Sequence, residues 1–217
     1  MTPTMKPHVF ERLSPEEQRS RAEALFSSMK ARRSVREFSD APLELEVVRR
    51  CIDVAAQAPS GANKQPWTFV LVTEPALKQQ LREAAEAEER AFYEGRAPES
   101  WLADLGPLGT DWHKPFLEVA PALIVVFAQN RGATEADRHY YVQESVGIAA
   151  GFLIAALHQC GFATLTHTPS PMGFLGELLG RPKTERAVLL LPVGFPAQGC
   201  RVPAIERKAR GEYLVER

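Results

Sequence analysis

Apolar residues recur at helical spacing in the first part of the chain. Between residues 15 and 31 they fall three or four positions apart behind Ser14 and Pro15, and this pattern predicts an amphipathic helix. A second helix is predicted at about 43–57, because the next periodic run is ended by Pro59. Both helices lie upstream of the first strand-like run.

Two later helical segments differ in polarity. Residues 75 to about 93 are highly charged, and we expect this helix to be exposed. Residues 139–160 carry apolar side chains around nearly the whole circumference, with many Gly and Ala, which is typical of a buried helix or of one at a two-fold subunit interface. The segment 95–114 contains Gly, Pro and two Trp, and it predicts an irregular surface excursion or lid.

Four apolar runs have strand length. The runs 67–72, 122–127 and 187–191 are almost continuously apolar, and 162–166 is a shorter candidate. Continuous apolar runs are typical of strands buried on both faces, so we expect a sheet covered by helices on both sides. The glycines between 173 and 180 indicate turns around a short helix rather than a phosphate-binding loop.

Length, charge and cysteine content narrow the class of protein. The 217 residues suit a single domain spanning 1–217. The 26 basic residues nearly balance the 27 acidic ones, and the net charge of -1 argues against a nucleic-acid partner. Three cysteines without a Cys-x-x-Cys pair, no leader-like N-terminus and no run of about 20 apolar residues favour a cytoplasmic protein without a membrane partner.

The five histidines do not indicate a metal site. They form no His-Glu-x-x-His pattern and have no cysteine partners at zinc spacing, so we expect no metal. A Gly-x-Gly-x-x-Gly motif is also missing from the sequence, which argues against a dedicated Rossmann site for a nicotinamide nucleotide.

Two motifs point to a bound flavin. Arg32, Arg33 and Arg36 lie within five residues and offer planar, permanently charged groups for a phosphate. The segment 59–67 reads Pro-Ser-Gly-Ala-Asn-Lys-Gln-Pro-Trp, in which small residues let backbone N–H groups approach a flat ligand. Taken singly, the first motif is also typical of a solvated, charged helix end, and the second of a helix-terminating turn.

A third set of residues lies around the irregular segment. Glu89 and Tyr93 are four positions apart, so they share one face of the charged helix, and Lys114 follows the irregular segment. Each of them alone is compatible with an ordinary surface position, because charged runs are usually solvated. Their occurrence together, behind the two flavin motifs, favours a common site.

The order of these motifs resembles the FMN-dependent nitroreductase superfamily and, within it, the iodotyrosine deiodinase branch, over nearly the whole chain from about residue 30. The resemblance implies an α+β fold in which helices flank a central mixed sheet, and a domain-swapped homodimer that holds two FMN molecules at the subunit boundary. It also implies a lid at about 85–115 and a C-terminal arm at about 199–217 that reaches the partner subunit.

The resemblance assigns the cofactor contacts. The arginines of the first motif would face the FMN phosphate and the N1/O2 edge of the ring, where a cation stabilises the reduced, anionic flavin. Thr166 would place its hydroxyl near N5 and favour one-electron steps, while His167 departs from the threonine-rich form of this motif. The implied FMN-binding residues are Arg32, Arg33, Ser34, Arg36, Pro59, Ser60, Gly61, Thr166, Thr168 and Arg207.

The resemblance also assigns the substrate contacts. Glu89 would bind the ammonium group and Lys114 the carboxylate of an amino acid, with Tyr93 as a hydrogen-bonding partner. The backbone N–H of Ala62 would face the phenolic oxygen and stabilise a phenolate, in the manner of an oxyanion hole. Ala62 and Thr166 are therefore the implied catalytic residues.

These assignments imply FMN-dependent reductive dehalogenation of iodotyrosine, and by extension of bromo- and chlorotyrosine, to tyrosine and halide. NAD(P)H or a reductase would supply the electrons. Alternatives that share the flavin motifs are a broad NAD(P)H-dependent nitro or quinone reductase, a flavin-consuming dimethylbenzimidazole synthase and a non-catalytic FMN-binding protein. The set Glu89, Tyr93 and Lys114 favours the dehalogenase over these alternatives.

Overall fold

The computed structural model describes residues 3–132, 134 and 137–217 of the chain. The described residues form two compact units, one that ends at Arg32 and one that begins at Arg33. The boundary falls inside the arginine-rich motif, so Arg32 belongs to the first unit and Arg36 to the second.

A single helix, α1 (Pro15–Ala31), forms the regular part of the first unit. Ser14 and Glu17 close a capping box at its start: the Glu17 N–H donates to the Ser14 hydroxyl, and the Ser14 N–H donates to the Glu17 carboxylate. The bounds of α1 agree with the sequence pattern. Within the described residues α1 buries none of its own side chains, so local capping rather than packing marks where it begins.

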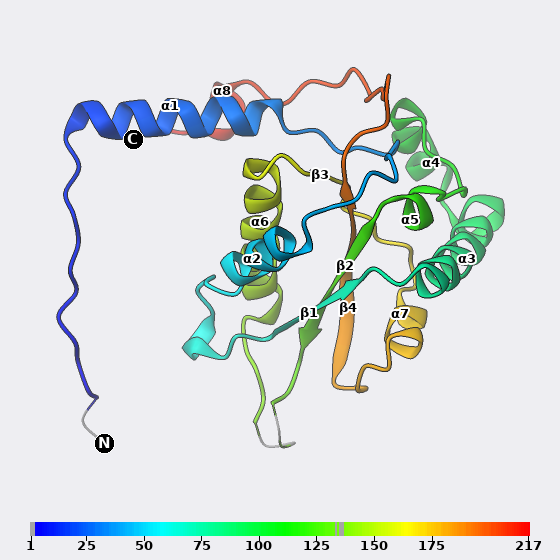
Figure 1. The fold of residues 1–217 in the computed structure, drawn as a ribbon, viewed down its shortest axis with the longest axis horizontal. Coiled ribbons are helices and arrows are strands. Elements are labelled where there is room, and N and C mark those ends of the chain that lie inside the picture. Colours follow the sequence, from blue (N-terminus) through cyan, green and yellow to red (C-terminus); the bar gives the residue numbers. More distant parts are fainter. Residues whose placement is uncertain (1–2, 133, 135–136) are drawn as a thin grey trace. The chain divides into compact units, whose positions relative to one another are not determined.

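The second unit contains the remaining helices and all strands of the described chain (Figure 1). In chain order its elements are α2 (Leu45–Ala55), η1 (Gly61–Asn63), β1 (Trp67–Val72), α3 (Pro75–Ala91), η2 (Phe92–Arg96), α4 (Glu99–Leu105), η3 (Gly106–Leu108), α5 (Phe116–Val119), β2 (Ala122–Gln129), α6 (Val142–Gln159), β3 (Ala163–Thr164), α7 (Gly173–Leu178), β4 (Glu185–Gly194) and α8 (Arg210–Tyr213).

The sheet has the strand order β1-β2-β4-β3, and each of these neighbouring pairs is antiparallel. A parallel bridge between Ser34 and Thr164 adds the chain just after the first unit to the edge of β3. The Val35 N–H donates to the Thr164 carbonyl at 3.1 Å. The predicted α+β architecture is therefore confirmed, and its parallel component is confined to this bridge among the described residues.

The two faces of β2 belong to different hydrophobic cores. Ile124 and Val126 pack with residues of α2 and α6, whereas Leu123, Val125 and Phe127 pack with residues of α3, α5 and α7. Successive side chains of a strand point to opposite faces, so one continuous apolar run serves both cores. Figure 1 shows α2 and α6 on one side of the sheet and α3, α5 and α7 on the other. The predicted cover on both faces is confirmed.

The helix α3 and the segment after it differ from the sequence predictions. α3 buries Leu81 and Ala85 although its charges predicted an exposed helix, because an apolar stripe one or two residues wide is enough to dock a helix. It continues into η2, a single π-helical turn. The segment 95–114, predicted to be irregular, contains α4 and η3.

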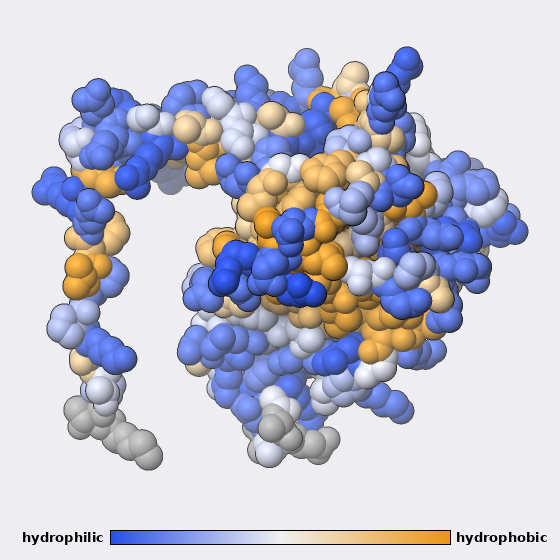
Figure 2. Space-filling model, in the orientation of Figure 1, coloured by the Kyte–Doolittle hydropathy of each residue, from blue (hydrophilic) through white to orange (hydrophobic). Residues whose placement is uncertain are grey.

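The helix α6 is buried on one face only. Ala149, Leu153 and Leu157 are buried against the sheet side, but Ile148 and Phe152 are 42% and 41% exposed. In the single chain the helix is therefore not buried all round, and of the two predicted alternatives the two-fold interface stays a prediction. Figure 2 shows apolar residues at the surface around α2 and α6. Among the described residues, none of the helices combines the length and the apolar character needed to cross a membrane.

Two other elements are shorter than their patterns predicted. β3 keeps two residues of the predicted 162–166, and α2 covers Leu45–Ala55 rather than 43–57. The residues that follow β3 line a cavity and stay joined to the sheet through an antiparallel bridge between His167 and Leu190, so regular strand pairing ends at Thr164 although the alternating pattern continues.

Truncation of a core residue should reveal the central position of β2. Leu123→Ala should lower the free energy of unfolding by about 3 kcal/mol, because a fully buried side chain is removed and a cavity remains. Urea denaturation at fixed protein concentration measures this change. As a control, Val9 is 93% exposed, and Val9→Ala should change the unfolding free energy by less than about 0.5 kcal/mol. Equal effects of the two substitutions would contradict the assignment.

Candidate functional site

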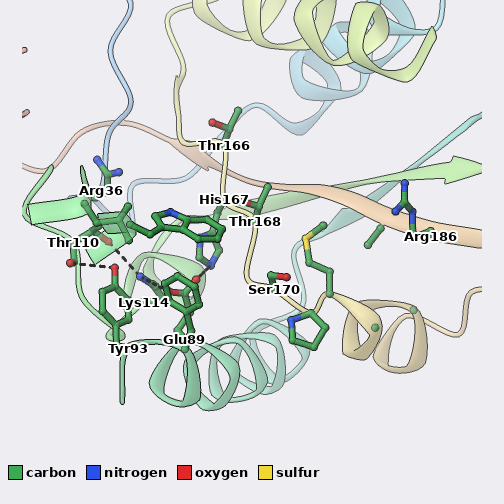
Figure 3. A pocket seen from close by; sticks show the side chains of 18 of the residues that line it. Arg36, Glu89, Tyr93, Thr110, Lys114, Thr166, His167, Thr168, Ser170 and Arg186 are labelled. Atoms are coloured by element: carbon green, nitrogen blue, oxygen red, sulfur yellow. Dashed lines mark hydrogen bonds and ion pairs between the residues drawn. The ribbon is translucent and has the colours of Figure 1, made fainter. Parts of the chain in front are cut away.

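A cavity of about 760 Å³ lies between the end of α3, the α4 region and the segment that follows β3 (Figure 3). Its walls include six of the residues singled out in the sequence, although they come from four separate stretches of chain. These residues are Arg36, Glu89, Tyr93, Lys114, Thr166 and Thr168. The structure therefore brings together the arginine motif, the predicted lid residues and the threonine motif.

Backbone pairing explains how the arginine and threonine motifs meet. The bridge between Ser34 and Thr164 places Arg36 beside the chain that leads from β3 to Thr166. Along that chain Thr166 and Thr168 are exposed toward the cavity, whereas His167 between them is buried. This alternation is the period of extended backbone, and two hydrogen bonds of 2.9 Å between His167 and Leu190 hold it in place.

Glu89 and Lys114 form a buried ion pair inside the cavity. Lys114 Nζ lies 3.3 Å from Glu89 Oε2, and the two side chains are 3% and 13% exposed, respectively. The Lys114 backbone N–H donates to Glu86 Oε1 at 2.8 Å, which anchors this residue to α3. Figure 3 shows Glu89 and Lys114 turned toward each other.

Tyr93 and Thr110 complete the surroundings of the Lys114 ammonium group. The Tyr93 hydroxyl donates to the Thr110 carbonyl at 3.2 Å, and Lys114 Nζ donates to Thr110 Oγ1 at 3.3 Å. A further hydrogen bond runs from Lys114 Nζ to the Asp111 carbonyl. Lys114 Nζ also lies 5.7 Å from the centroid of the Tyr93 ring. The three predicted lid residues thus form one connected cluster.

Burial dominates the ionisation of this cluster. Burial lowers the pKa of Lys114 and raises the pKa of Glu89, and the opposite charge of each partner opposes the shift without cancelling it. Burial also raises the pKa of Tyr93. Charges taken out of water destabilise a fold unless their attraction compensates for the lost hydration. The pair is therefore better suited to binding than to stability, as is common at functional sites.

Arg36 faces the same cavity from the other wall. Its guanidinium group is half-buried, and burial lowers the pKa of Arg36. A smaller cavity of about 290 Å³ also contains Arg36, together with Ser34 and Arg201. The neighbouring Arg33 donates a hydrogen bond to the Pro203 carbonyl, so this part of the motif is tied to the chain after β4.

The turn at 59–62 lies elsewhere in the second unit. It precedes the start of β1, whereas α3 follows the end of that strand, and at about 3.4 Å per residue the strand separates them by about 20 Å. The cavity lining among the described residues accordingly lacks Pro59, Ser60, Gly61 and Ala62. Figure 1 shows this turn and α3 at opposite ends of β1.

The turn itself has a specific backbone geometry. Ala62 is left-handed, with φ 48° and ψ 30°, a conformation that costs a non-glycine residue about 1 kcal/mol. Asn63 and Lys64 donate the two backbone hydrogen bonds of the turn, and the Ala62 N–H takes part in neither. A Cβ on Gly61 would lie 2.9 Å from Tyr141 Cδ2 and 3.2 Å from the Tyr140 carbonyl oxygen, so a larger residue here would require its neighbours to shift.

Two arginines of the predicted set are positioned differently. Arg32 is the C-cap of α1 in the first unit, where its N–H donates to the Met29 carbonyl. Arg207 is exposed in the tail between β4 and α8, and the described cavity lining does not include it.

The cavity also contains residues that the sequence did not single out as site residues. They include Trp101, Thr110, Met172 and Arg186. Thr110 and Trp101 lie in the segment predicted as a lid, and this position in the sequence could have marked them as candidate site residues. Met172 and Arg186 come from the loop before α7 and from β4, and only the tertiary structure brings them to this cavity.

The side chains of the cavity fit a flat anionic cofactor. Arg36 supplies a cation, Thr166 and Thr168 supply hydroxyl groups, and Met172 supplies an apolar contact surface. Such a mixture of apolar wall and few polar groups is typical of cofactor sites. Within the described part of the chain, no group of three or more His, Cys, Asp or Glu side chains is arranged to hold a metal ion.

Comparisons with known proteins identify relatives of this chain. Residues 29–195 match the Nitroreductase family. The chain is 51% identical over 216 residues to an iodotyrosine deiodinase of Haliscomenobacter hydrossis, a match that covers 98% of this chain and 97% of that protein. It is 42% identical over 213 residues to an iodotyrosine deiodinase of Nematostella vectensis, with 96% of this chain and 81% of the relative covered.

A solved structure shares the fold. It is a crystal structure of oxidised iodotyrosine deiodinase bound to FMN and 3-iodo-L-tyrosine, with a TM-score of 0.76 and 32% sequence identity. The similarity covers 88% of this chain and 100% of that chain. The named residues of the cavity of about 760 Å³ all fall within the matched range 29–195.

The buried ion pair makes a prediction for stability. Lys114→Met should lower the free energy of unfolding by about 3 kcal/mol at neutral pH, because it leaves the Glu89 carboxylate buried without a cation. Adding Glu89→Gln removes the unpaired charge, so the double variant should recover most of this loss. Urea denaturation of the two single variants and the double variant completes the cycle. A double variant less stable than Lys114→Met would contradict the pairing.

Proposed function

The chain belongs to the nitroreductase family and, within it, to the iodotyrosine deiodinases, and we propose that it dehalogenates halotyrosines reductively with FMN as its cofactor. One observation carries this proposal: a buried carboxylate and a buried ammonium group lie 3.3 Å apart in the same cavity as Arg36 and Thr166. Family membership supplies the reaction class, and the cavity supplies a place for an amino-acid substrate beside the cofactor.

Glu89 and Lys114 would bind the two charged ends of the substrate. The α-ammonium group pairs with Glu89 and the α-carboxylate with Lys114, so a zwitterion exchanges one buried ion pair for two. Since both side chains are already dehydrated, binding adds little further desolvation of the protein. The exchange therefore favours a ligand that carries both charges over one that carries a single charge.

Tyr93 and the π-helical turn that carries it would close the substrate pocket. Tyr93 lies next to the ammonium group of Lys114, and its hydroxyl is held by the Thr110 carbonyl. π-Helical turns inside or beside α-helices often occur at functional sites. Ordering of the lid at about 85–115 would exclude water from the substrate ring and strengthen the charge interactions around it.

The flavin motifs would hold FMN against this pocket. Arg36 faces the cavity and suits the electron-rich edge of the ring, and the hydroxyl groups of Thr166 and Thr168 face the same space. The rest of the proposed FMN-binding set is Arg32, Arg33, Ser34, Pro59, Ser60, Gly61 and Arg207. When bound, FMN supplies the two electrons needed to replace the carbon–halogen bond by a carbon–hydrogen bond, and NAD(P)H or a reductase is the proposed source of these electrons.

A second subunit would complete the site. The turn at 59–62 lies about 20 Å from the lid end of β1 within one chain, so one chain does not supply both parts of the flavin cradle. The exposed apolar face of α6, with Ile148 and Phe152, offers a surface for a homodimer. In such a dimer the turn of one subunit would meet the cavity of the other, and the arm at about 199–217 would extend over the partner.

Ala62 would act on the phenol ring in this dimer. Its left-handed backbone leaves the N–H outside the two hydrogen bonds of the turn, which suits a donor to the phenolic oxygen. A fixed N–H that favours the phenolate would polarise the ring during reduction. The proposed catalytic residues are thus Ala62 and Thr166.

The odd number of cysteines and the lack of a Cys-x-x-Cys pair support a cytoplasmic location.

A single-turnover experiment tests the function. The FMN-loaded protein is reduced without oxygen and mixed with 3-iodotyrosine or with a nitroaromatic compound in a stopped-flow instrument. We expect rapid flavin reoxidation with 3-iodotyrosine and the release of one iodide for each reduced flavin that is oxidised. Fast reoxidation by the nitroaromatic compound without iodide release would favour a nitroreductase, and no reoxidation by either would favour a non-catalytic flavoprotein.

Removal of the Lys114 ammonium group should separate substrate binding from cofactor binding. Lys114→Ala should weaken 3-iodotyrosine binding by about 100-fold, because a charge pair with the substrate is lost inside a buried site. FMN content should stay unchanged. Titration followed by flavin fluorescence measures the affinity, and Lys183→Ala, at an exposed lysine outside the cavity, is the control. Unchanged affinity in Lys114→Ala would refute the role of this residue.

A further inference from the structure

The imidazole of His167 has an unsatisfied polar atom beside the substrate-binding pair. Its Nε2 is buried and has no hydrogen-bond partner among the described residues, and the side chain is 8% exposed. Buried polar atoms in native proteins are almost always hydrogen-bonded, so an orphaned one requires an explanation. Packing alone would be satisfied by an apolar residue at this position.

Glu89 offers the acceptor that this nitrogen lacks. Nε2 of His167 is 4.0 Å from Glu89 Oε1, which is beyond hydrogen-bonding distance but within the reach of a small carboxylate rotation. The other carboxylate oxygen, Oε2, is the one paired with Lys114 at 3.3 Å. Glu89 therefore lies between two donors, of which Lys114 is the one within ion-pair contact distance among the described residues. Figure 3 shows His167, Glu89 and Lys114 side by side at the cavity wall.

The His167 ring is neutral, so it can donate a hydrogen bond without competing with the ammonium group of the substrate. Burial, with the positive charges of Lys114 and Arg36, lowers the pKa of His167 to about 3, and Phe116 packs edge-to-face on the ring at 5.5 Å between centroids. A neutral imidazole carries one N–H. It can hydrogen-bond to a carboxylate without neutralising it, whereas a cation at this place would displace the ammonium group of a substrate.

We propose that His167 is a positioning residue for Glu89: when a substrate ammonium group draws the Glu89 carboxylate away from Lys114, the Nε2–H of His167 donates to Glu89 Oε1 and fixes the carboxylate in its substrate-binding orientation. This inference rests on the proposed function, because it requires an α-ammonium group in the cavity. It explains why a polar ring occupies a buried position between Thr166 and Thr168, whose side chains face the cavity.

Selectivity follows from this arrangement. A ligand with an ammonium group gains the His167–Glu89 hydrogen bond as well as its own ion pair, whereas a ligand without that group leaves Glu89 on Lys114. His167 should thus contribute to the preference for the amino acid over ring analogues that lack the amino group, and it should contribute nothing to binding of the ring itself.

Two variants and two ligands test the proposal on the full-length, FMN-loaded protein. His167→Phe keeps an aromatic ring against Phe116 but has no donor, and His167→Gln places an amide N–H near the position of Nε2. The ligands are 3-iodotyrosine and 3-(4-hydroxy-3-iodophenyl)propionate, which has the same ring and carboxylate but no ammonium group. Flavin fluorescence reports both affinities, and thermal denaturation and FMN content report folding.

The expected pattern is selective. His167→Phe should weaken 3-iodotyrosine binding by about ten-fold, the value of a hydrogen bond to a charged group, and leave binding of the propionate unchanged. His167→Gln should restore most of the affinity for 3-iodotyrosine. A merely structural role would weaken both ligands equally and would not be rescued by glutamine.

The outcomes separate this inference from the function on which it rests. If the wild-type protein binds 3-iodotyrosine and His167→Phe binds it equally well, or loses both ligands in parallel, the positioning role of His167 is wrong and the proposed function stands. If the FMN-loaded wild-type protein does not bind 3-iodotyrosine, the proposed function fails and this inference fails with it.

Discussion

The buried ion pair between Glu89 and Lys114 is the constraint on which the site depends. Two dehydrated charges can face each other only if the surrounding chain fixes both of them. The fold does so through α3 and α5: Glu86 accepts the Lys114 N–H, and Lys78 Nζ donates to the Glu118 and Ala120 carbonyls at 2.8 Å each. These hydrogen bonds join α3 to the chain around α5 and thereby hold in place two charges that would otherwise be better solvated by water.

The sheet sets the second wall of the cavity. Its central strands are buried on both faces, and the continuous apolar sequence of β2 packs against two helical layers at once. β3 at the edge pairs with Ser34 of the arginine motif in a parallel bridge, and the chain after it passes Thr166 before His167 pairs with Leu190 of β4. As a result, segments more than a hundred residues apart in the sequence line one cavity without a long loop to connect them.

In the proposed FMN site, the single chain would supply the charged side chains more completely than the backbone turn. Arg36 and the threonines face the cavity, while the left-handed turn with Ala62 is at the other end of β1. The exposed apolar face of α6 is the surface proposed for the homodimer, because small and apolar residues allow two copies to approach closely. In the proposed homodimer, subunit association and FMN binding would therefore depend on each other.

Local sequence determined those features whose causes are local. The capping box at Ser14 and Glu17 fixed the start of α1, and the apolar run 67–72 gave the bounds of β1 without error. The order of short motifs also named Arg36, Glu89, Tyr93, Lys114, Thr166 and Thr168, which line the cavity. The tertiary structure decided what depends on partners distant in the chain: that α3 docks through Leu81 and Ala85 despite its charge, that α6 buries one face only, and that β3 is cut to two residues. It alone decided that Glu89 and Lys114 pair with each other and that His167 lies buried beside them. Burial removes the water that would otherwise solvate these groups separately, and the spacing of residues in the sequence does not encode burial.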